Sequence, residues 1–256
     1  MAKVVKSALA SRFTKVDANA AKQRLIGGSY GEVGTLKTSF WLGAPGPMLV
    51  QNLDNGLEGV IEEYQKLKDI YVETYNANTD GVEQEEAIVE RDRFISDFED
   101  AITNGIRTII WDKETQVYEL FKYAEFGAPS SNPNNYYPLF QRYRRLFNMA
   151  KASDINFGVI QGMQTPWGSK VNLGNGKTAG ARLDGQRKRR GMAEVEELVQ
   201  VNIEHYLDAE VNEFKMKIGK VRGPGARDIQ NEVIDALTFV EFVQLVFPDS
   251  DESDWL

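Results

Sequence analysis

Short apolar runs of strand length alternate along the chain with stretches whose apolar residues recur at helical spacing. This alternation is typical of βαβ units and predicts an α/β fold, with a mostly parallel central sheet and helices on both of its faces. Two late runs predict antiparallel strands added to that sheet. In chain order, the predicted strands are residues 22–30, 48–53, 107–111, 155–160, 199–207 and 213–221.

Helical spacing fills most of the intervals between these runs. The first predicted helix opens at Thr38 and ends before Pro45, because a proline cannot continue a helix. Later helices are predicted over residues 57–77, over a stretch that ends near Asn104, and over residues 114–123, 136–151 and 228–246. The segments that break the pattern are an acidic insert at 78–86, a turn-rich loop at 127–135 and a mobile loop or hairpin excursion at 165–191.

The composition is that of one globular domain. Of the 256 residues, 42% are hydrophobic and 27% are charged, which is enough apolar material for a substantial core. We therefore expect a flexible N-terminal arm at residues 1–21, one domain at 22–247 and an acidic C-terminal tail at 248–256.

Several classes of site are excluded by residues that the chain lacks. It has no cysteine, so disulfides, thiolate zinc sites and a cysteine nucleophile are ruled out, and His205 is the single histidine. No apolar run approaches the ~20 residues that span a bilayer, so we expect a cytoplasmic protein without a membrane partner. The net charge of −8 repels phosphate on average, so any nucleic-acid contact must come from a local basic surface.

The sharpest motif lies between the first strand and the first helix. The string GEVGTLKTS matches the phosphate-binding pattern G-x-x-x-x-G-K-[ST], apart from a leucine at the place of the last glycine. Such a loop curls backbone N–H groups round phosphate oxygens, while an ammonium and a hydroxyl contact the phosphates and Mg²⁺. The predicted ATP-binding residues are Gly31, Glu32, Val33, Gly34, Thr35, Leu36, Lys37, Thr38 and Ser39.

Glycine-lysine strings in this chain also have other interpretations. A glycine-rich turn with a surface lysine would give the same letters as the Lys37 loop, and the Leu36 side chain must point away from a nucleotide. A second string at 174–178, GNGKT, has Val171 where the first glycine belongs and no strand before it. We interpret that second string as a flexible loop.

Two acids follow predicted strands. Asp112 comes directly after TIIW, at the carboxyl edge where open α/β sheets bind ligands, and would hold Mg²⁺ together with Thr38. A helix cap is the alternative role for such an aspartate. Asp54, after MLVQNL, is the first choice for orienting the attacking water, with Glu58 and Glu114 behind it.

The order of these islands resembles the RecA/KaiC/DnaB-like ATPases, with TIIWD, INFGVIQ and a late K-x-R as the later motifs. More narrowly, SYGEVGTLKTSFWLGAPGPMLVQNLDNGLEGV is similar to phage-encoded RecA-like nucleotide-binding proteins, some of which are single-strand-annealing recombinases. The resemblance covers residues 24–224. It implies that Gln161 senses the γ-phosphate, and that Lys220 and Arg222 are fingers reaching a neighbouring subunit's ATP in a ring or filament. A strand with alternating exposed bases is the other interpretation.

Positive charge is concentrated after the fourth strand, where RecA-like proteins place DNA-contacting loops. Backbone contact with single-stranded DNA is the expected use, and Trp167 could stack a base. A solvated basic loop that pairs with the acidic surface is the alternative. The predicted DNA-binding residues are Arg182, Arg187, Lys188, Arg189 and Arg190. Three further bases either extend the DNA-binding surface or form an oligomer interface: Arg142, Arg144 and Arg145.

The resemblance thus predicts an oligomeric Mg²⁺-dependent ATPase acting on single-stranded DNA in phage recombination or replication, inside a bacterial host. Its acidic tail, DSDESDWL, either docks a single-stranded-DNA-binding protein or other replication protein, or only solubilises the chain. Two further alternatives remain open: a KaiC-like ATPase with a protein client, and a nucleotide-binding scaffold with little or no hydrolysis.

Overall fold

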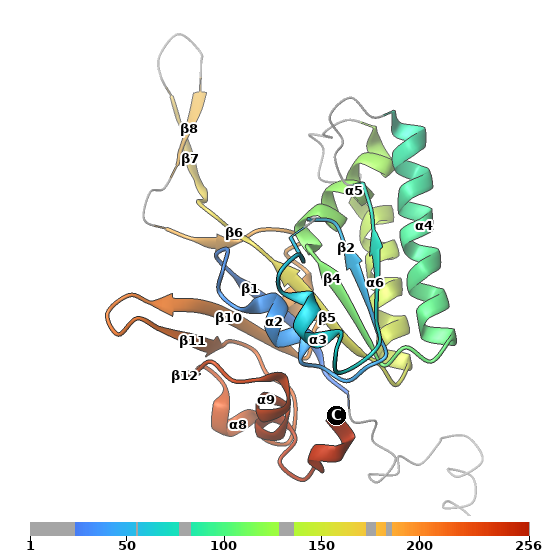
Figure 1. The fold of residues 1–256 in the computed structure, drawn as a ribbon. Coiled ribbons are helices and arrows are strands. Elements are labelled where there is room, and N and C mark those ends of the chain that lie inside the picture. Colours follow the sequence, from blue (N-terminus) through green and yellow to red (C-terminus); the bar gives the residue numbers. More distant parts are fainter. Residues whose placement is uncertain are drawn as a thin grey trace, which may run out of the picture.

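The computed structural model describes residues 24–54, 56–76, 83–127, 136–172, 178–182 and 186–255. The expected N-terminal arm, residues 1–21, lies outside this part of the chain. The described residues form an eight-stranded sheet with the order β12-β11-β10-β1-β5-β4-β2-β3, flanked by helices (Figure 1).

The sheet is mostly parallel. Each neighbouring pair from β10 across to β3 runs in the same direction, whereas β11 runs antiparallel to both β10 and β12. The predicted α/β class and the late antiparallel strands are therefore confirmed. The strands are β1 (Ile26–Gly31), β2 (Met48–Asn52), β3 (Ile70–Thr74), β4 (Thr108–Asp112), β5 (Asn156–Gln161), β10 (Val201–Asp208), β11 (Glu213–Ile218) and β12 (Val233–Asp235).

Two hydrophobic clusters cover the two faces of the sheet. In β4, Ile109 and Trp111 belong to one cluster and Ile110 to the other, because successive side chains of a strand point to opposite faces. A parallel sheet is buried on both sides, which explains why the central strands are continuous apolar runs. The first cluster contains α4 (Gln84–Thr103), α5 (Glu114–Phe126) and α6 (Tyr137–Ala152), and the second contains α2 (Lys37–Leu42) and α9 (Phe239–Val246).

Close packing fixes α2 against the middle of the sheet. A Cβ atom on Gly158 would lie 2.3 Å from the ring of Trp41, and one on Gly27 would lie 2.9 Å from it. The indole of Trp41 also donates a hydrogen bond to the Ser29 hydroxyl over 2.9 Å. Glycine in β1 and β5 therefore lets the helix that follows the glycine loop approach the sheet closely.

The helix predicted over residues 57–77 is wrong. Only α3 (Ile61–Tyr64) is helical, and the chain then enters β3, whose Ile70 pairs with Met48 of β2. The residues of β3 are β-branched or aromatic at four positions out of five, and pairing with the sheet prevails over the weaker helical spacing.

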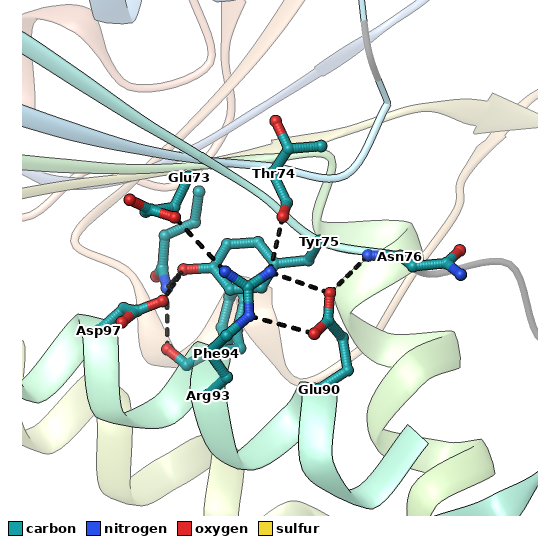
Figure 2. Close-up of polar contacts among 9 residues, drawn as sticks. Glu73, Thr74, Tyr75, Asn76, Glu90, Arg93, Phe94 and Asp97 are labelled. Carbon is teal, nitrogen blue, oxygen red and sulfur yellow. Dashed lines mark hydrogen bonds and ion pairs between the residues drawn. The ribbon is translucent and has the colours of Figure 1, made fainter. Parts of the chain in front are cut away.

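A network of polar contacts ties this edge strand to α4 (Figure 2). The hydroxyl of Tyr75 donates to Asp97 over 2.7 Å and accepts from the Gln51 amide over 3.1 Å. Arg93 lies 4.4 Å above the Tyr75 ring, and its guanidinium donates to the Thr74 carbonyl over 2.7 Å. The network holds the sheet edge together with the packing of the Tyr75 ring on Phe94, whose ring centroids lie 4.9 Å apart.

The predicted closing helix over 228–246 is also wrong. The segment contains the end of α8 (Ala226–Ile229), then β12, then α9. Asn231 adopts a left-handed φ of 69°, which a helix interior does not allow, and Thr238 starts α9 with a capping box to Glu241.

The excursion predicted at 165–191 is confirmed as a hairpin region. β7 (Trp167–Asn172) pairs antiparallel with β8 (Thr178–Arg182), and β6 (Met163–Gln164) pairs antiparallel with β9 (Lys188–Arg189). Figure 1 shows the β7–β8 hairpin projecting away from the central sheet. Residues 174–177 of the GNGKT string lie outside the described residues, as do 78–82 of the acidic insert and 128–135 of the predicted loop.

The acidic tail packs on the domain instead of extending from it. Its last described turn, η3 (Glu252–Trp255), follows α9, and Trp255 is only 1% exposed. The Trp255 ring stacks on Phe247 at 5.5 Å, and its indole N–H donates to Ser250 over 2.9 Å. A tryptophan buried in its own chain is not available to dock a partner, so that expectation is wrong for Trp255. Among the described helices, none has the length and apolar composition needed to cross a bilayer.

Candidate functional site

The glycine loop lies at the carboxyl end of β1, in the middle of the sheet. Gly31 has no room for a side chain, because a Cβ atom there would lie 2.1 Å from the His205 carbonyl oxygen. Gly34 and Leu36 both adopt left-handed φ angles, of 79° and 66°. Leu36 thus takes the backbone conformation expected of the glycine that it replaces, with its side chain 41% exposed. The loop keeps its tight curvature despite the substitution.

The ammonium group of Lys37 is held inside this loop. It donates to the Glu32 carbonyl and, over 3.1 Å, to the Thr35 hydroxyl, which itself donates to the Glu32 carbonyl over 2.8 Å. Burial lowers the pKa of Lys37, and the carboxylate of Asp112 acts in the opposite direction. A partly desolvated cation of this kind gains free energy when an anion binds beside it.

Thr38 and Asp112 meet at the start of α2. The Thr38 hydroxyl donates to the Asp112 carboxylate over 3.0 Å, although the two residues are far apart in the sequence. Asp112 is 8% exposed, and burial raises its pKa while the Thr38 hydroxyl offsets part of the shift. A hydroxyl and a carboxylate in contact fit Mg²⁺, which prefers oxygen ligands and keeps water and phosphate in its remaining positions. The described residues contain no group of three or more His, Asp or Glu side chains that would hold a metal without such added ligands.

The three acids considered for water activation lie in different places. Asp54 lines the same cavity as Lys37, and its carboxylate pairs with the Lys113 ammonium over 3.0 Å. Glu58 is exposed and does not line that cavity. Glu114 is fully buried beneath it, away from bulk water. Of the three, Asp54 is the one that lines the cavity.

Glu114 has a function in the structure that sequence reasoning did not find. Its carboxyl accepts from the Gln161 amide over 2.6 Å and from the Met192 N–H over 3.3 Å. Burial raises its pKa to about 7, more than these hydrogen bonds lower it. The side-chain amide oxygen of Gln161, Oε1, is buried and has no hydrogen-bond partner within the described part of the chain. Gln161 is therefore held by its nitrogen, and its oxygen is left to accept a hydrogen bond.

These groups surround one cavity of about 450 Å³, a volume that suits a small-molecule ligand. It brings together residues from the ends of β1, β2, β4 and β5, as expected for an open α/β sheet. The lining contains the whole loop from Gly31 to Ser39, and also Asp54, Asp112, Lys113, Gln161 and Arg190.

Lys220 and Arg222 do not line this cavity. Lys220 donates to the carbonyls of Glu196 and Glu197 over 2.8 and 3.0 Å, and its own carbonyl accepts from the Asn202 N–H over 2.9 Å. Asn202 pairs with Gly28, in the amino-terminal half of β1. The two cations consequently lie toward the opposite end of the sheet from the glycine loop of their own chain.

The basic residues of the hairpin region are not equivalent. Lys188 is exposed, whereas Arg187 forms an ion pair with Glu32 of the glycine loop over 3.1 Å. The Arg189 guanidinium, only 14% exposed, pairs with Glu196 over 2.8 Å. Arg182 belongs to β8, and its side chain lies outside the described part.

The bases of α6 also have acidic partners. Arg142 pairs with an acid of α5 and Arg145 with an acid of α4, over 3.4 and 2.7 Å. Arg144 pairs over 2.8 Å with Glu194, beside α7 (Val195–Leu198). These side chains are thus placed as cross-links between helices.

The single histidine lies behind the glycine loop. His205 is buried and contacts the Ser29 hydroxyl over 3.0 Å, and burial lowers its pKa to about 3. It stays neutral and structural, and does not line the cavity.

Fold and site together define an α/β protein with a mostly parallel central sheet flanked by helices, compatible with a Rossmann- or P-loop-like fold. Comparison of the sequence with protein-family models and with curated proteins finds no match in either set. The chemistry of the cavity is therefore argued from its own residues.

Proposed function

We propose that this protein is a Mg²⁺-dependent ATPase of RecA-like type, which acts on single-stranded DNA as an oligomer. The contact between Thr38 and Asp112 carries the proposal, because this hydroxyl and this carboxylate are oxygen groups of the kind that Mg²⁺ prefers, beside a glycine loop that holds a lysine. The glycine loop and Thr38 follow β1, whereas Asp112 ends β4. A match of the loop sequence to a motif does not by itself bring these two parts of the chain together.

In this proposal the loop from Gly31 to Ser39 binds the phosphates of ATP through its N–H groups, with Lys37 beside the β- and γ-phosphates. Thr38 and Asp112 would hold Mg²⁺, which when bound supplies positive charge to the phosphate oxygens. Asp54 would orient the attacking water, and Gln161 would sense the terminal phosphate.

Oligomerisation would complete the site. Lys220 and Arg222 lie far from the glycine loop of their own chain, which supports their use as fingers toward a neighbour's nucleotide. A cation that enters from the next subunit stabilises negative charge on the transferred phosphoryl group. A ring or filament would then hydrolyse ATP faster than a monomer does.

DNA binding is the part of the proposal that rests on the hairpin region. The β7–β8 hairpin projects from the body (Figure 1), and Lys188, in β9 after that hairpin along the chain, is exposed. Because phosphate contacts release counterions, affinity for single-stranded DNA should fall steeply with salt. Phage recombination or replication is the process that the sequence resemblance suggests.

The test is ATP turnover with and without single-stranded DNA, for wild type and Lys37→Ala. We expect DNA to stimulate the wild type and Lys37→Ala to lose ~100-fold or more in turnover, because a preorganised cation at the phosphates is removed. Lys66→Ala, at an exposed lysine outside the cavity, is the matched control and should leave turnover unchanged.

Each other outcome has a definite meaning. Equal turnover in wild type and Lys37→Ala would refute the site. Nucleotide binding without turnover would favour a scaffold, and turnover that ignores single-stranded DNA would favour a protein client.

A further inference from the structure

Arg189 and Arg190 are neighbours in the sequence, but their side chains go to different places. The Arg189 guanidinium lies over the Tyr30 ring at 5.5 Å and donates to the Asn202 side chain over 3.2 Å, besides its ion pair with Glu196. Arg190 is exposed and is one of the residues that line the cavity of the glycine loop. In an extended chain successive side chains point to opposite sides. Because Arg189 faces the body of the protein, Arg190 faces the other side, where the cavity lies.

The backbone on both sides of Arg190 is anchored. Its N–H donates to the Gly162 carbonyl over 2.8 Å, and its carbonyl accepts from the Thr115 hydroxyl over 3.3 Å. Gly191 follows with a left-handed φ of 114°, and a Cβ atom there would lie 2.0 Å from the Glu114 carboxylate. These contacts fix the segment against the ends of β5 and α5, so the position of Arg190 is set by the fold.

The cations around the cavity differ in how they are already engaged. Lys113 pairs with Asp54, and Lys37 is bound within the glycine loop. For the guanidinium of Arg190, the part of the chain that the structure describes provides neither a hydrogen-bond acceptor nor an ion-pair partner. An anion in the cavity would supply both, and the planar fork of an arginine matches the geometry of a phosphate.

We propose that Arg190 contacts the phosphates of a bound nucleotide from the same chain, and that it favours a nucleoside triphosphate over a diphosphate. The inference rests on the proposed function and refines it. The Glu114 carboxyl accepts hydrogen bonds both from Gln161 and from Met192, two residues after Arg190. Arg190 therefore lies near Gln161, at the end of the cavity where the terminal phosphate would lie. The sequence had assigned Arg190 to DNA, and this position assigns it to the nucleotide.

The experiment measures dissociation constants for a non-hydrolysable Mg·ATP analogue and for Mg·ADP, by titration calorimetry. Wild type, Arg190→Gln and Lys188→Gln are compared, and the same proteins are titrated with a fluorescent single-stranded oligonucleotide. We expect Arg190→Gln to weaken the ATP analogue by ~10-fold or more, as befits the loss of a charge-assisted hydrogen bond. Its affinity for Mg·ADP and for the oligonucleotide should stay within about twofold.

The control and the charge-retaining variant sharpen the result. Lys188→Gln should leave both nucleotides unaffected, since Lys188 does not line the cavity. Arg190→Lys should recover only part of the affinity for the ATP analogue, because an ammonium lacks the bidentate fork.

Failure of the inference and failure of the proposed function give different results. If wild type discriminates ATP from ADP and Arg190→Gln does so equally well, the inference is overturned and the function stands. Weaker oligonucleotide binding with unchanged nucleotide binding would return Arg190 to DNA. A wild type that binds neither nucleotide would refute both.

Discussion

Two polar clusters border the sheet, and they differ in how completely their groups are paired. Beside β3 and α4, the Gln51 side chain donates to Tyr75 and to the Phe94 carbonyl, and accepts from the Trp111 indole. At the glycine loop, the Gln161 oxygen has no partner among the described residues. Both ends of the Gln51 amide in β2 are thus hydrogen-bonded, whereas the Gln161 amide in β5 is bonded through its nitrogen alone among the described residues.

The pKa shifts follow the same division. In the first cluster, hydrogen bonding to Glu90 raises the pKa of Arg93, so the fold favours its charged form. Around the cavity, burial lowers the pKa of Lys37 and raises the pKa of Asp112, so the fold disfavours both charges. A satisfied network stabilises the protein by itself, whereas an under-satisfied one is stabilised by a ligand. The comparison therefore separates polar groups kept for folding from those kept for binding.

A matched pair of aspartate substitutions should show the largest difference between the clusters. Asp112→Asn removes the carboxylate that we propose to hold Mg²⁺, and we expect ATP turnover to fall ~100-fold or more without loss of folding stability, because a disfavoured buried charge is also removed. Asp97→Asn weakens the hydrogen bond from Tyr75 and should lower the free energy of unfolding by about 1 kcal/mol, with turnover unchanged.

Turnover assays and urea unfolding of both proteins measure the two effects. Similar stability losses in both variants, with turnover intact, would mean that the cavity acids are only structural.

Glu114 should give the molecule a recognisable pH dependence. The pKa of Glu114 is about 7 in the folded protein and 4.5 in the unfolded chain. Between pH 4.5 and pH 7 the native state therefore keeps a proton that the unfolded chain loses. Stability must then fall as the pH rises through this window, by about 1.4 kcal/mol per pH unit and about 3 kcal/mol in all. Below pH 4.5 and above pH 7 this contribution becomes constant.

Urea unfolding of wild type and Glu114→Gln at pH 5 and pH 8 measures the effect. The variant cannot titrate at this position, so the difference between the two proteins isolates Glu114 from Asp112, whose pKa is also raised. Parallel stability curves for the two proteins would show that Glu114 is ionised in the fold.

The two clusters also differ in what the sequence could predict. The loop at Lys37 and the acid at Asp112 follow from local rules, since a strand, a glycine turn and a helix occur in order and each acid ends an apolar run. The buried contact of Glu114 with Gln161 could not be found this way. A glutamate in the first turn of a helix is ordinarily explained by the helix dipole, and nothing local indicates that α5 buries it under Gln161.

Strand pairing explains the other features that the sequence did not predict. The assignment of all hairpin bases to DNA assumed equivalent side chains, but the pairing of β9 with β6 turns Arg189 inward and leaves Arg190 at the cavity. Similarly, β3 forms a strand because β2 offers it an edge, and the anchoring of that edge through Tyr75 requires partners from β2 and α4. Such contacts join residues distant in sequence, so local periodicity does not contain them.

The smallest expected effects come from removing one cation of each cluster. Lys37→Met takes away a charge that burial disfavours, so we expect the free energy of unfolding to stay the same or rise slightly. Arg93→Met takes away a charge that Glu90 and the Tyr75 ring favour, and the side chain is 39% exposed, so solvent screening limits the loss to less than about 1 kcal/mol. Urea unfolding of both variants at low ionic strength gives the two signs directly. If both substitutions destabilise the protein equally, Lys37 belongs with the folding residues and the division between the clusters does not hold.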